Sequence, residues 1–317
     1  MNNLIIVRGG GDLATGTIYK LKKSGFQVLI LETRYPSAIR RNVAFCEAVY
    51  QGSQTVEDLT CHRAETLEQA REFLNKGKLT VLVDPAGEAI KALKPLAVVD
   101  AILAKKNLGT SRELAPITVA LGPGFTAGVD VDAVVETKRG HHLGRVLWSG
   151  TAAPNTGVPG IIGGYGKERV IHCPARGILR NVRKITDTVQ KGEVIALVET
   201  AEGAVPVEAT LDGILRGLIR DGYPVTVGFK IADIDPRSEE LGNCFTISDK
   251  ARCIAGACWR PSSSESGSWA YDYRGRRLRR QDHPHQKAGR TILRRGKIRP
   301  GDHHHPHVHR GGYPFDG

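Results

Sequence analysis

The chain has 317 residues, 40% of them hydrophobic, and a formal net charge of +12 at pH 7. This length predicts two domains, and the apolar content is enough for sizeable cores. No apolar run approaches the ~18 residues that a membrane-spanning helix needs, and the start of the chain lacks the basic flank and cleavage site of a signal peptide. We therefore expect a cytoplasmic protein with no membrane span.

The positive charge is unevenly distributed along the chain. Residues 259–317 contain 13 Lys and Arg against 5 Asp and Glu, which accounts for +8 of the +12. The remaining residues are close to balanced. The basic composition therefore belongs mostly to the C-terminal tail, and it predicts no specific nucleic-acid partner for the folded part.

The cysteine pattern favours reduced thiols. None of the six cysteines forms a C-x-x-C pair, and their spacing fits neither a disulfide framework nor a metal cluster. They are Cys46, Cys61, Cys173, Cys244, Cys253 and Cys258. We expect no metal site.

The N-terminus reads as one strand–helix–strand unit. Residues 4–7 form a β-branched run, a glycine cluster follows, residues 17–24 have helical spacing, and residues 26–31 predict a second buried strand that ends at Glu32. Gly9, Gly11 and Ala14 fit the G-x-G-x-x-G/A spacing of a dinucleotide-binding fold.

Each position of this loop has a physical reason. The first glycine makes a tight turn, the second lets a pyrophosphate approach the backbone, and the third position must be small for helix and strand to pack. The acid at position 32 lies where it would bind a ribose. The candidate cofactor-binding residues here are Gly9, Gly10, Gly11, Asp12, Ala14, Thr15 and Glu32. Two alternatives stay open: Asp12 repels phosphate unless it points away or caps the helix, and the loop is also compatible with a plain turn.

The next segments continue the strand–helix alternation. Helical spacing over 66–75 is followed by a strand over 79–83, a helix or strand–helix pair over 96–105, and a strand over 117–121. This pattern predicts a parallel, doubly wound sheet that binds ligands beyond the carboxyl ends of its strands. Gly122 and Gly124 follow the last strand, either as a second phosphate-approach loop or as a plain turn.

Other polar residues give weaker indications. Arg34, Arg40 and Arg41 follow the second strand, where ligand would lie, but a solvated loop and helix face is the favoured interpretation of each. His141 and His142 lack a Glu at metal-binding spacing, so we interpret them as a solvent-facing pair. His141 is the one weak acid/base candidate. No catalytic residue is assigned.

The second half contains an internal repeat. Residues 175–200 resemble residues 211–236 at an offset of 36, including G-I-L-R at 177–180 and 213–216. Two interlocked β-halves are expected, and the pattern resembles the biotinyl/lipoyl carrier domain. The position of the carrier lysine is occupied by Glu202, which cannot form the amide link to biotin or lipoate. A docking or structural module is therefore expected here, without carrier chemistry.

The end of the chain changes character after Cys258. Residues 259–317 have no helical or strand periodicity, which predicts a disordered tail. It is compatible with a basic arm for acidic partners, with a histidine-rich metal tract, or with a reading-frame change near Cys258, which the Arg, Pro, His, Gly and Ser bias favours. The predicted organisation is a Rossmann-like domain (1–150), a linker (151–168), a β domain (169–240), the start of a closing helix (241–258) and the tail (259–317).

Five motifs extend across residues 1–257. They are RGGGDLATG at 8–16, ALGPGF at 120–125, ETKRGH at 136–141, PNTG at 154–157 and IADIDPR at 231–237. In these motifs the chain resembles the accessory proteins of selenium-dependent molybdenum hydroxylases, of YqeB type. The tail departs from this family.

The resemblance implies a maturation factor that helps insert or finish the molybdenum cofactor of a hydroxylase. Its implied partners are the apo hydroxylase or cofactor-synthesis proteins, and its ligand is open between a nucleotide or dinucleotide and a molybdopterin-type cofactor. Two other functions compete with this one: a nucleotide- or NAD(P)-dependent oxidoreductase that uses the glycine loop, and a non-catalytic docking scaffold. The oligomeric state is open.

Overall fold

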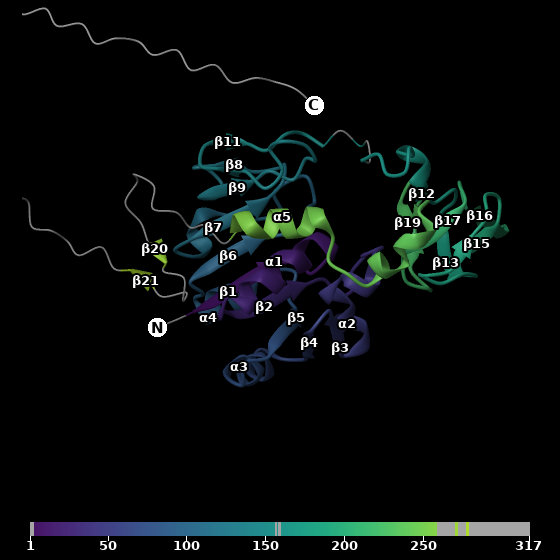
Figure 1. Ribbon diagram of the computed structural model, residues 1–317. Coiled ribbons are helices and arrows are strands. Elements are labelled where there is room, and N and C mark those ends of the chain that lie inside the picture. The colour runs from purple at the N-terminus through teal and green to yellow at the C-terminus, as the bar shows by residue number, and fades with distance from the viewer. Residues whose placement is uncertain (1–2, 156, 158–159, 259–269, 272–276, 279–317) are drawn as a thin grey trace, which may run out of the picture. The chain divides into compact units, whose positions relative to one another are not determined.

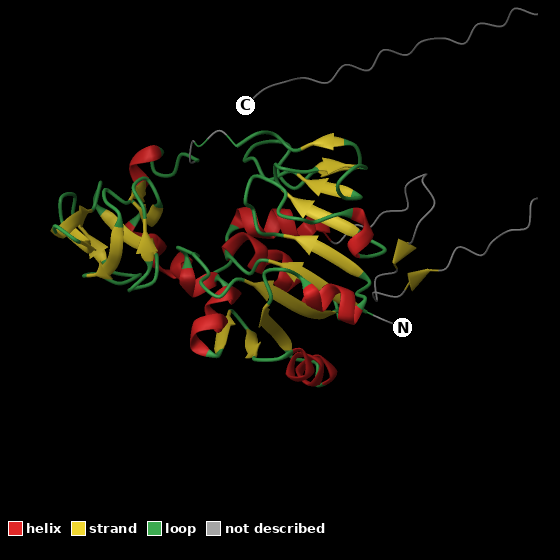
Figure 2. Ribbon diagram, turned by 180° about the vertical axis from the view of Figure 1, so that it is seen from behind, coloured by secondary structure: helices red, strands yellow, loops and turns green. Residues whose placement is uncertain are grey.

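The computed structural model describes residues 3–155, 157, 160–258, 270–271 and 277–278. Its main feature is a nine-stranded sheet with the strand order β10-β9-β7-β6-β1-β2-β5-β4-β3, which Figures 1 and 2 show with helices on its faces. The strands are β1 Leu4–Arg8, β2 Gln27–Glu32, β3 Ser53–Val56, β4 Leu59–Ala64, β5 Leu79–Val83, β6 Ala97–Asp100, β7 Thr118–Leu121, β9 Ala133–Val135 and β10 Val146–Leu147.

The sheet is parallel from β4 to β9 and antiparallel at its two edges, β3 and β10. From β1 the chain proceeds outward on one side through β2, and it returns to the other side with β6. The strand order therefore reverses between β1 and β6. In an open α/β sheet this reversal is where the carboxyl ends of the strands leave room for a ligand.

Five α-helices are described: α1 Asp12–Lys23, α2 Ala48–Gln51, α3 Leu67–Asn75, α4 Glu88–Leu93 and α5 Asp249–Cys258. Short 3-10 turns accompany them at Arg41–Val43, Phe45–Glu47, Arg112–Leu114, Lys167–Arg169 and Ser238–Cys244. Helix α3 begins where its sequence predicts, because the Thr66 hydroxyl accepts a hydrogen bond from the Gln69 N–H.

Three expectations about these elements are wrong in detail. Helix α1 begins at Asp12 rather than at residue 17, directly after the glycines. The hairpin of β3 and β4 was not expected, because its two strands are short and largely polar. The chain after β6 has no helix over 101–105. There Leu103 and Lys105 have positive φ angles, which a helix does not allow.

The β-rich part contains two four-stranded sheets, with the orders β12-β19-β17-β14 and β16-β15-β13-β18. Its strands are β12 Val170–His172, β13 Gly177–Asn181, β14 Thr188–Val189, β15 Val194–Thr200, β16 Gly203–Glu208, β17 Gly213–Leu218, β18 Pro224–Val225 and β19 Lys230–Asp235. Two further strands, β8 Thr126–Ala127 and β11 Gly150–Thr151, pair with each other beside the nine-stranded sheet.

The sequence repeat is a structural repeat. Strand β13 pairs with β18 of the second copy, and β17 pairs with β14 of the first, so the two copies exchange strands. Gly177 and Gly213 occupy equivalent places. A Cβ atom on Gly177 would lie 2.0 Å from the carbonyl oxygen of Glu199, and one on Gly213 would lie 2.3 Å from that of Asp235. Both glycines are therefore required by the same close approach of two strands.

The predicted tail lies almost entirely outside the described residues. Within it, β20 (Ala270–Tyr271) and β21 (Arg277–Leu278) form an antiparallel pair. The predictions of disorder and of a reading-frame change near Cys258 concern residues that the structure does not describe.

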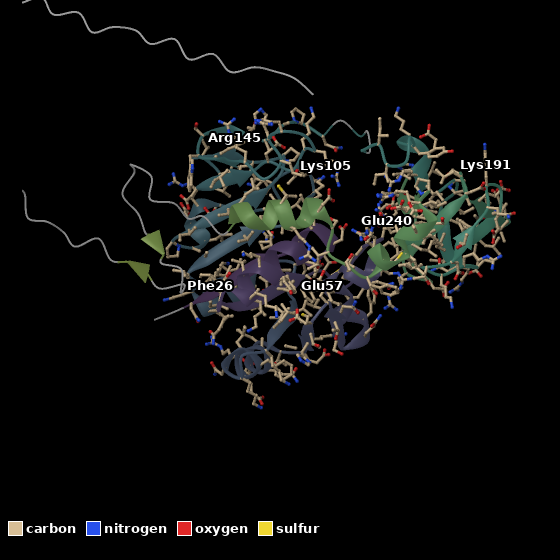
Figure 3. The ribbon with its side chains drawn as sticks, viewed as in Figure 1. Phe26, Glu57, Lys105, Arg145, Lys191 and Glu240 are labelled. Carbon is tan, nitrogen blue, oxygen red and sulfur yellow. The ribbon has the colours of Figure 1, made fainter. Side chains whose placement is uncertain are left out.

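After the β-rich part the chain returns to the nine-stranded sheet, where α5 lies beside α1 (Figure 1). Gly16 sits at the contact, because a Cβ atom there would lie 2.6 Å from the carbonyl oxygen of Ala251. Glu57, labelled in Figure 3, holds the approach to α5 by accepting a hydrogen bond from the Ile247 N–H at 3.0 Å and pairing with Arg252. Ile254 is fully buried in the core that the two helices share.

We predict that Gly16→Ala lowers the free energy of unfolding by about 1–3 kcal/mol, because the added methyl group must push α5 away from α1. Gly256→Ala is the matched control. It lies on α5, and a Cβ atom there meets nothing within 4 Å. Urea unfolding of the full chain measures both. The control should be neutral or slightly stabilising, and a Gly16→Ala variant as stable as the control would contradict the α1–α5 contact.

Candidate functional site

A cavity of about 400 Å³ opens at the carboxyl ends of the central strands. Its walls combine the glycine loop after β1, Glu32 at the end of β2, Asp84 after β5 and the segment after β6. These elements meet where the strand order reverses, so the cavity, here called the glycine-loop cavity, occupies the place expected for a ligand in such a sheet.

The three glycines of the loop have different roles. Gly9 has φ +92°, and a Cβ atom there would lie 2.9 Å from the Ala101 carbonyl oxygen. Gly10 faces the protein, since its Cβ would lie 3.0 Å from the Cys46 backbone nitrogen. Gly11 lines the cavity, and a Cβ there meets nothing within 4 Å. Gly9 and Gly10 therefore shape the turn, and Gly11 leaves the backbone open to a ligand in the cavity.

Gly11 is also the N-cap of α1, and it offers no side chain to the first N–H groups of the helix. The start of a helix carries unpaired N–H groups and a partial positive charge, which together favour an anion. The open approach at Gly11 and the start of α1 thus coincide on the wall of one cavity. This arrangement can hold a phosphate.

Glu32 lines the same cavity but already has partners. One carboxylate oxygen accepts a hydrogen bond from the Gly10 N–H at 2.8 Å, and the other accepts one from the Thr33 N–H at 2.7 Å. Burial raises the pKa of Glu32, and these two hydrogen bonds oppose the rise. The side chain holds the glycine loop in shape, and a ribose hydroxyl would share the carboxylate with these N–H groups.

Ala14 and Thr15 do not line the cavity. Both are fully buried on α1. Ala14 fills the position that must be small for helix and strand to pack. The Thr15 hydroxyl donates to the Gly11 carbonyl at 2.9 Å and accepts from the Phe45 N–H at 3.0 Å. These two residues support the loop from behind.

Gly122 and Gly124 also lie away from this cavity. A Cβ on Gly122 would lie 2.7 Å from the Thr137 hydroxyl, and one on Gly124 would lie 2.7 Å from the Lys106 backbone. Both have positive φ angles, 78° and 110°. They form a tight turn, in which Gly122 packs against the Thr137 side chain and Gly124 against the Lys106 backbone, and this corresponds to the plain-turn alternative.

Two charged residues stabilise the edge of the cavity. Arg8 is buried and donates to the Thr110 hydroxyl at 2.6 Å and to the Leu108 carbonyl at 3.2 Å, with Asp100 3.8 Å away. Asp84 accepts from the N–H groups of Gly87 and Ala89 at the start of α4. The carboxylates here therefore organise loops.

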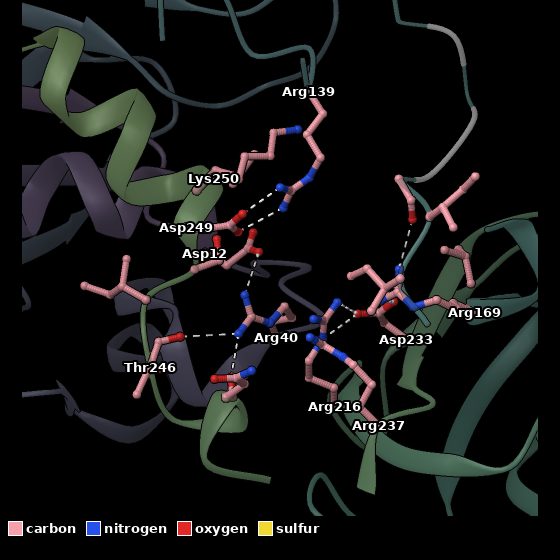
Figure 4. Close-up of a pocket in the computed structure, with 18 of the residues that line it drawn as sticks. Asp12, Arg40, Arg139, Arg169, Arg216, Asp233, Arg237, Thr246, Asp249 and Lys250 are labelled. Atoms are coloured by element: carbon pink, nitrogen blue, oxygen red, sulfur yellow. Dashed lines mark hydrogen bonds and ion pairs between the residues drawn. The ribbon is translucent and has the colours of Figure 1, made fainter. Parts of the chain in front are cut away.

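The carboxylate of Asp12 pairs with Arg40, whose guanidinium lies 3.8 Å away (Figure 4). Asp12 and Leu13 form a wall shared with a second cavity of about 610 Å³. We call this second space the basic cavity. Its seven cationic lining residues are Arg40, Arg139, Arg169, Arg216, Lys230, Arg237 and Lys250.

Most of the cations in the basic cavity are held by carboxylates. The Arg139 guanidinium binds both oxygens of Asp249, at 2.6 and 2.9 Å (Figure 4). Asp233, on β19, pairs with Arg169 and Arg216. Sequence reasoning placed only Asp12 and Arg40 near a ligand, because the other residues come from distant parts of the chain and no short motif groups them.

The segment that follows β2 joins the glycine loop to the β-rich part. The Cys46 N–H donates to the Gly10 carbonyl at 2.9 Å. The Arg41 guanidinium donates to the Leu218 carbonyl at 2.7 Å, and the Leu218 N–H donates to the Ile39 carbonyl at 3.0 Å. Residues 39–47, here called the bridging segment, therefore contact both the glycine loop and the β-rich part.

Of the weaker candidates, Arg40 lines the basic cavity, and His141, His142 and Arg34 line neither cavity. His141 and His142 are exposed and contact each other edge to face. Arg34 is exposed and lies over the Tyr35 ring. Among the described residues, no group of three or more His, Cys, Asp or Glu is arranged to hold a metal ion. In the same part of the chain, no helix has the length and apolar character needed to cross a bilayer.

No protein-family model matches the chain. One curated protein, "Uncharacterized protein YqeB" of Escherichia coli K12, is 49% identical over 255 residues, which is 80% of this chain and 46% of that protein. The chain thus spans less than half the length of this relative. The identity supports a relationship to YqeB-type proteins, and the relative's name assigns no role.

Solved structures give only distant likenesses. The ectoine utilization protein EutE (DoeB) of Ruegeria pomeroyi, with product bound, is 12% identical with a TM-score of 0.21, covering 73% of this chain and 56% of that one. An aspartoacylase family protein of Mesorhizobium loti is 10% identical (TM-score 0.24), and a succinylglutamate desuccinylase/aspartoacylase of Rhodobacter sphaeroides is 12% identical (TM-score 0.24). Each of the last two matches covers 74% of this chain and 84% of the matched chain. At such scores the likeness carries no argument about function.

The Arg139–Asp249 pair predicts a pH dependence of stability. The hydrogen bonds from Arg139 lower the pKa of Asp249 to about 2. The stabilisation is therefore present above the unfolded pKa of about 4, and it is lost as the pH falls toward 2. Because the pair is largely exposed, we expect Asp249→Asn to cost no more than about 1 kcal/mol at pH 7 and nothing near pH 2.

Urea unfolding at a series of pH values measures this difference. Glu202→Gln is the charge-matched control, since Glu202 is exposed and forms no ion pair among the described residues. The control should follow the wild-type curve. A constant offset between Asp249→Asn and wild type from pH 7 to pH 2 would show that the ion pair is not the cause.

Proposed function

We propose that this protein is an accessory factor for the maturation of a selenium-dependent molybdenum hydroxylase, and that it helps insert or finish the molybdenum cofactor. The cofactor is cargo in this proposal. Two findings support it: the 49% identity to a YqeB-type protein, and the succession of motifs that this type shares with residues 1–257. Both findings concern the sequence, and the structural support for the proposal comes from the chemistry of the glycine-loop cavity.

The observation that carries the proposal is the open approach at Gly11. The glycine-loop cavity has a helix start and an uncovered backbone on one wall, at the reversal of the strand order. This is the chemistry that holds the phosphate of a nucleotide, a dinucleotide or a pterin. The carboxylates that line the cavity all have partners: Glu32 and Asp84 accept from backbone N–H groups, and Asp12 pairs with Arg40, so they favour binding of a cargo over acid/base catalysis.

We propose further that the β-rich part has a biotinyl/lipoyl-like fold and serves as a docking module. Its two exchanged copies support this. Glu202 lies at the exposed turn between β15 and β16, where a carrier domain has its lysine. A carboxylate cannot form the amide link to biotin or lipoate, so this turn is available for contact with the apo hydroxylase or with cofactor-synthesis proteins, in the cytoplasm.

In a bacterium that makes such a hydroxylase, we predict that deleting this gene lowers the molybdenum content and the activity of the purified hydroxylase by at least about tenfold, without lowering the amount of its polypeptide. The wild-type gene should restore both. A gene carrying Gly11→Asp should not, because the new carboxylate would repel the phosphate of the cargo.

Gly256→Asp is the matched control, since that site on α5 is equally open and lies away from the glycine loop. Full molybdenum loading in the deletion strain would exclude the maturation role.

A ligand panel separates the proposed function from its alternatives. The full chain should be stabilised by one of NAD(H), NADP(H), CTP, ATP or molybdopterin, by about 2.7 kcal/mol at ~100 times the dissociation constant. The part of the shift in thermal unfolding that comes from the glycine-loop cavity should disappear in Gly11→Asp and persist in Gly256→Asp. Turnover of NAD(P)H with a bound substrate would favour an oxidoreductase, and no shift with any ligand would favour a scaffold.

A further inference from the structure

The basic cavity has an excess of positive charge that comes from two lysines. Its five arginines are matched by five carboxylates, three of them on the wall and two directly behind Arg216 and Arg237. The carboxylates are Asp12, Asp233, Asp235, Glu240 and Asp249. Lys230 and Lys250 also line the cavity, and neither has an ion-pair partner among the described residues. The excess is therefore two positive charges.

Other features of the cavity also indicate a missing anion. Burial lowers the pKa of Lys250 and the neighbouring Arg139 lowers it further, while Asp12, Asp249 and Glu136 oppose the fall. Burial likewise lowers the pKa of Arg40 and Arg216 adds to this, while Asp12 and Asp233 oppose it. The Nε atom of Arg40 is buried without a hydrogen-bond acceptor. Like charges gathered in a partly desolvated space repel each other, and a bound anion would relieve that repulsion.

We infer that the basic cavity is a binding site for a phosphate-bearing small molecule, with Lys230 and Lys250 holding the phosphate dianion. The charge of such a group matches the excess of two. This inference does not rest on the maturation role, and it concerns a site separate from the glycine loop.

The size and lining of the cavity favour an organic phosphate over the bare ion. A volume of about 610 Å³ is in the range of small-molecule sites. Leu13, Val170 and Ile247 add apolar surface to the wall. A phosphorylated molecule could place its charge on the lysines and its apolar body against these side chains.

A neighbouring cavity of about 810 Å³ extends the basic surface. It shares Arg139, Lys230 and Lys250 with the basic cavity, and it adds Lys105, Lys138 and Lys167. No carboxylate is among the residues that line it. A positive field over this surface would attract anionic ligands toward the two lysines.

Isothermal titration of the full chain tests this inference with three probes: inorganic phosphate, inorganic pyrophosphate and AMP, at constant ionic strength. We expect each probe to compete with the others for one site and AMP to bind more tightly than inorganic phosphate. Lys230→Gln and Lys250→Gln should each weaken binding by about tenfold, the loss of one charge-assisted contact. Lys191→Gln, in an exposed turn of the β-rich part (Figure 3), should leave binding unchanged.

Two further measurements show whether the lysine variants remain folded and whether binding is independent of the glycine loop. Without ligand, the lysine variants should unfold at the same temperature as wild type or higher, because each change removes repulsion. The affinity of the Gly11→Asp variant should equal that of wild type, because the glycine loop is a different site.

Absence of binding by all three probes, binding that is insensitive to both lysine changes, or binding that Gly11→Asp abolishes would overturn the inference. Lysine-dependent binding of a short DNA duplex that pyrophosphate does not displace would overturn it as well. A hydroxylase that matures without this protein would refute the maturation role and leave this site standing.

Discussion

The arrangement of the candidate sites depends on the backbone hydrogen bonds of the bridging segment, residues 39–47. On one side Cys46 donates to the carbonyl of Gly10, and on the other Ile39 and Arg41 are bonded to Leu218 in the β-rich part. The buried carboxylate of Glu47 adds an ion pair with Arg220 at 3.0 Å. The shape of the glycine loop and the position of β17 are thus fixed by the same few residues.

In these two proposals, the cavities would bind anions through different kinds of donor. At the glycine loop the donors are backbone N–H groups, which require small residues and an exact turn but no net charge. In the basic cavity the donors are side chains, and five arginines are already neutralised by carboxylates, which leaves two lysines as the net charge. Asp12 lines both cavities, and its carboxylate pairs with Arg40.

The sequence was sufficient for features that depend on local pattern. The strand–loop–helix unit, the carboxyl-edge position of Glu32 and the repeat at an offset of 36 residues are all present. The sequence did not predict the features that tertiary contacts determine. Nothing near Glu32 indicates that its carboxylate would bind the Gly10 N–H, nor does a motif join Arg139 to Asp249, 110 residues away. The lysines of the basic cavity were missed because only the fold brings β19 and α5 together.

The most direct test is to identify what the protein carries. The full chain would be purified from cells that make the molybdenum cofactor and from cells that cannot, and small molecules released on denaturation would be analysed by mass spectrometry. The account predicts a phosphate-bearing pterin or nucleotide in near-stoichiometric amount from the first cells, lost from the Gly11→Asp variant. A protein that retains no phosphate-bearing molecule from either source, although the folded state is intact, would contradict it.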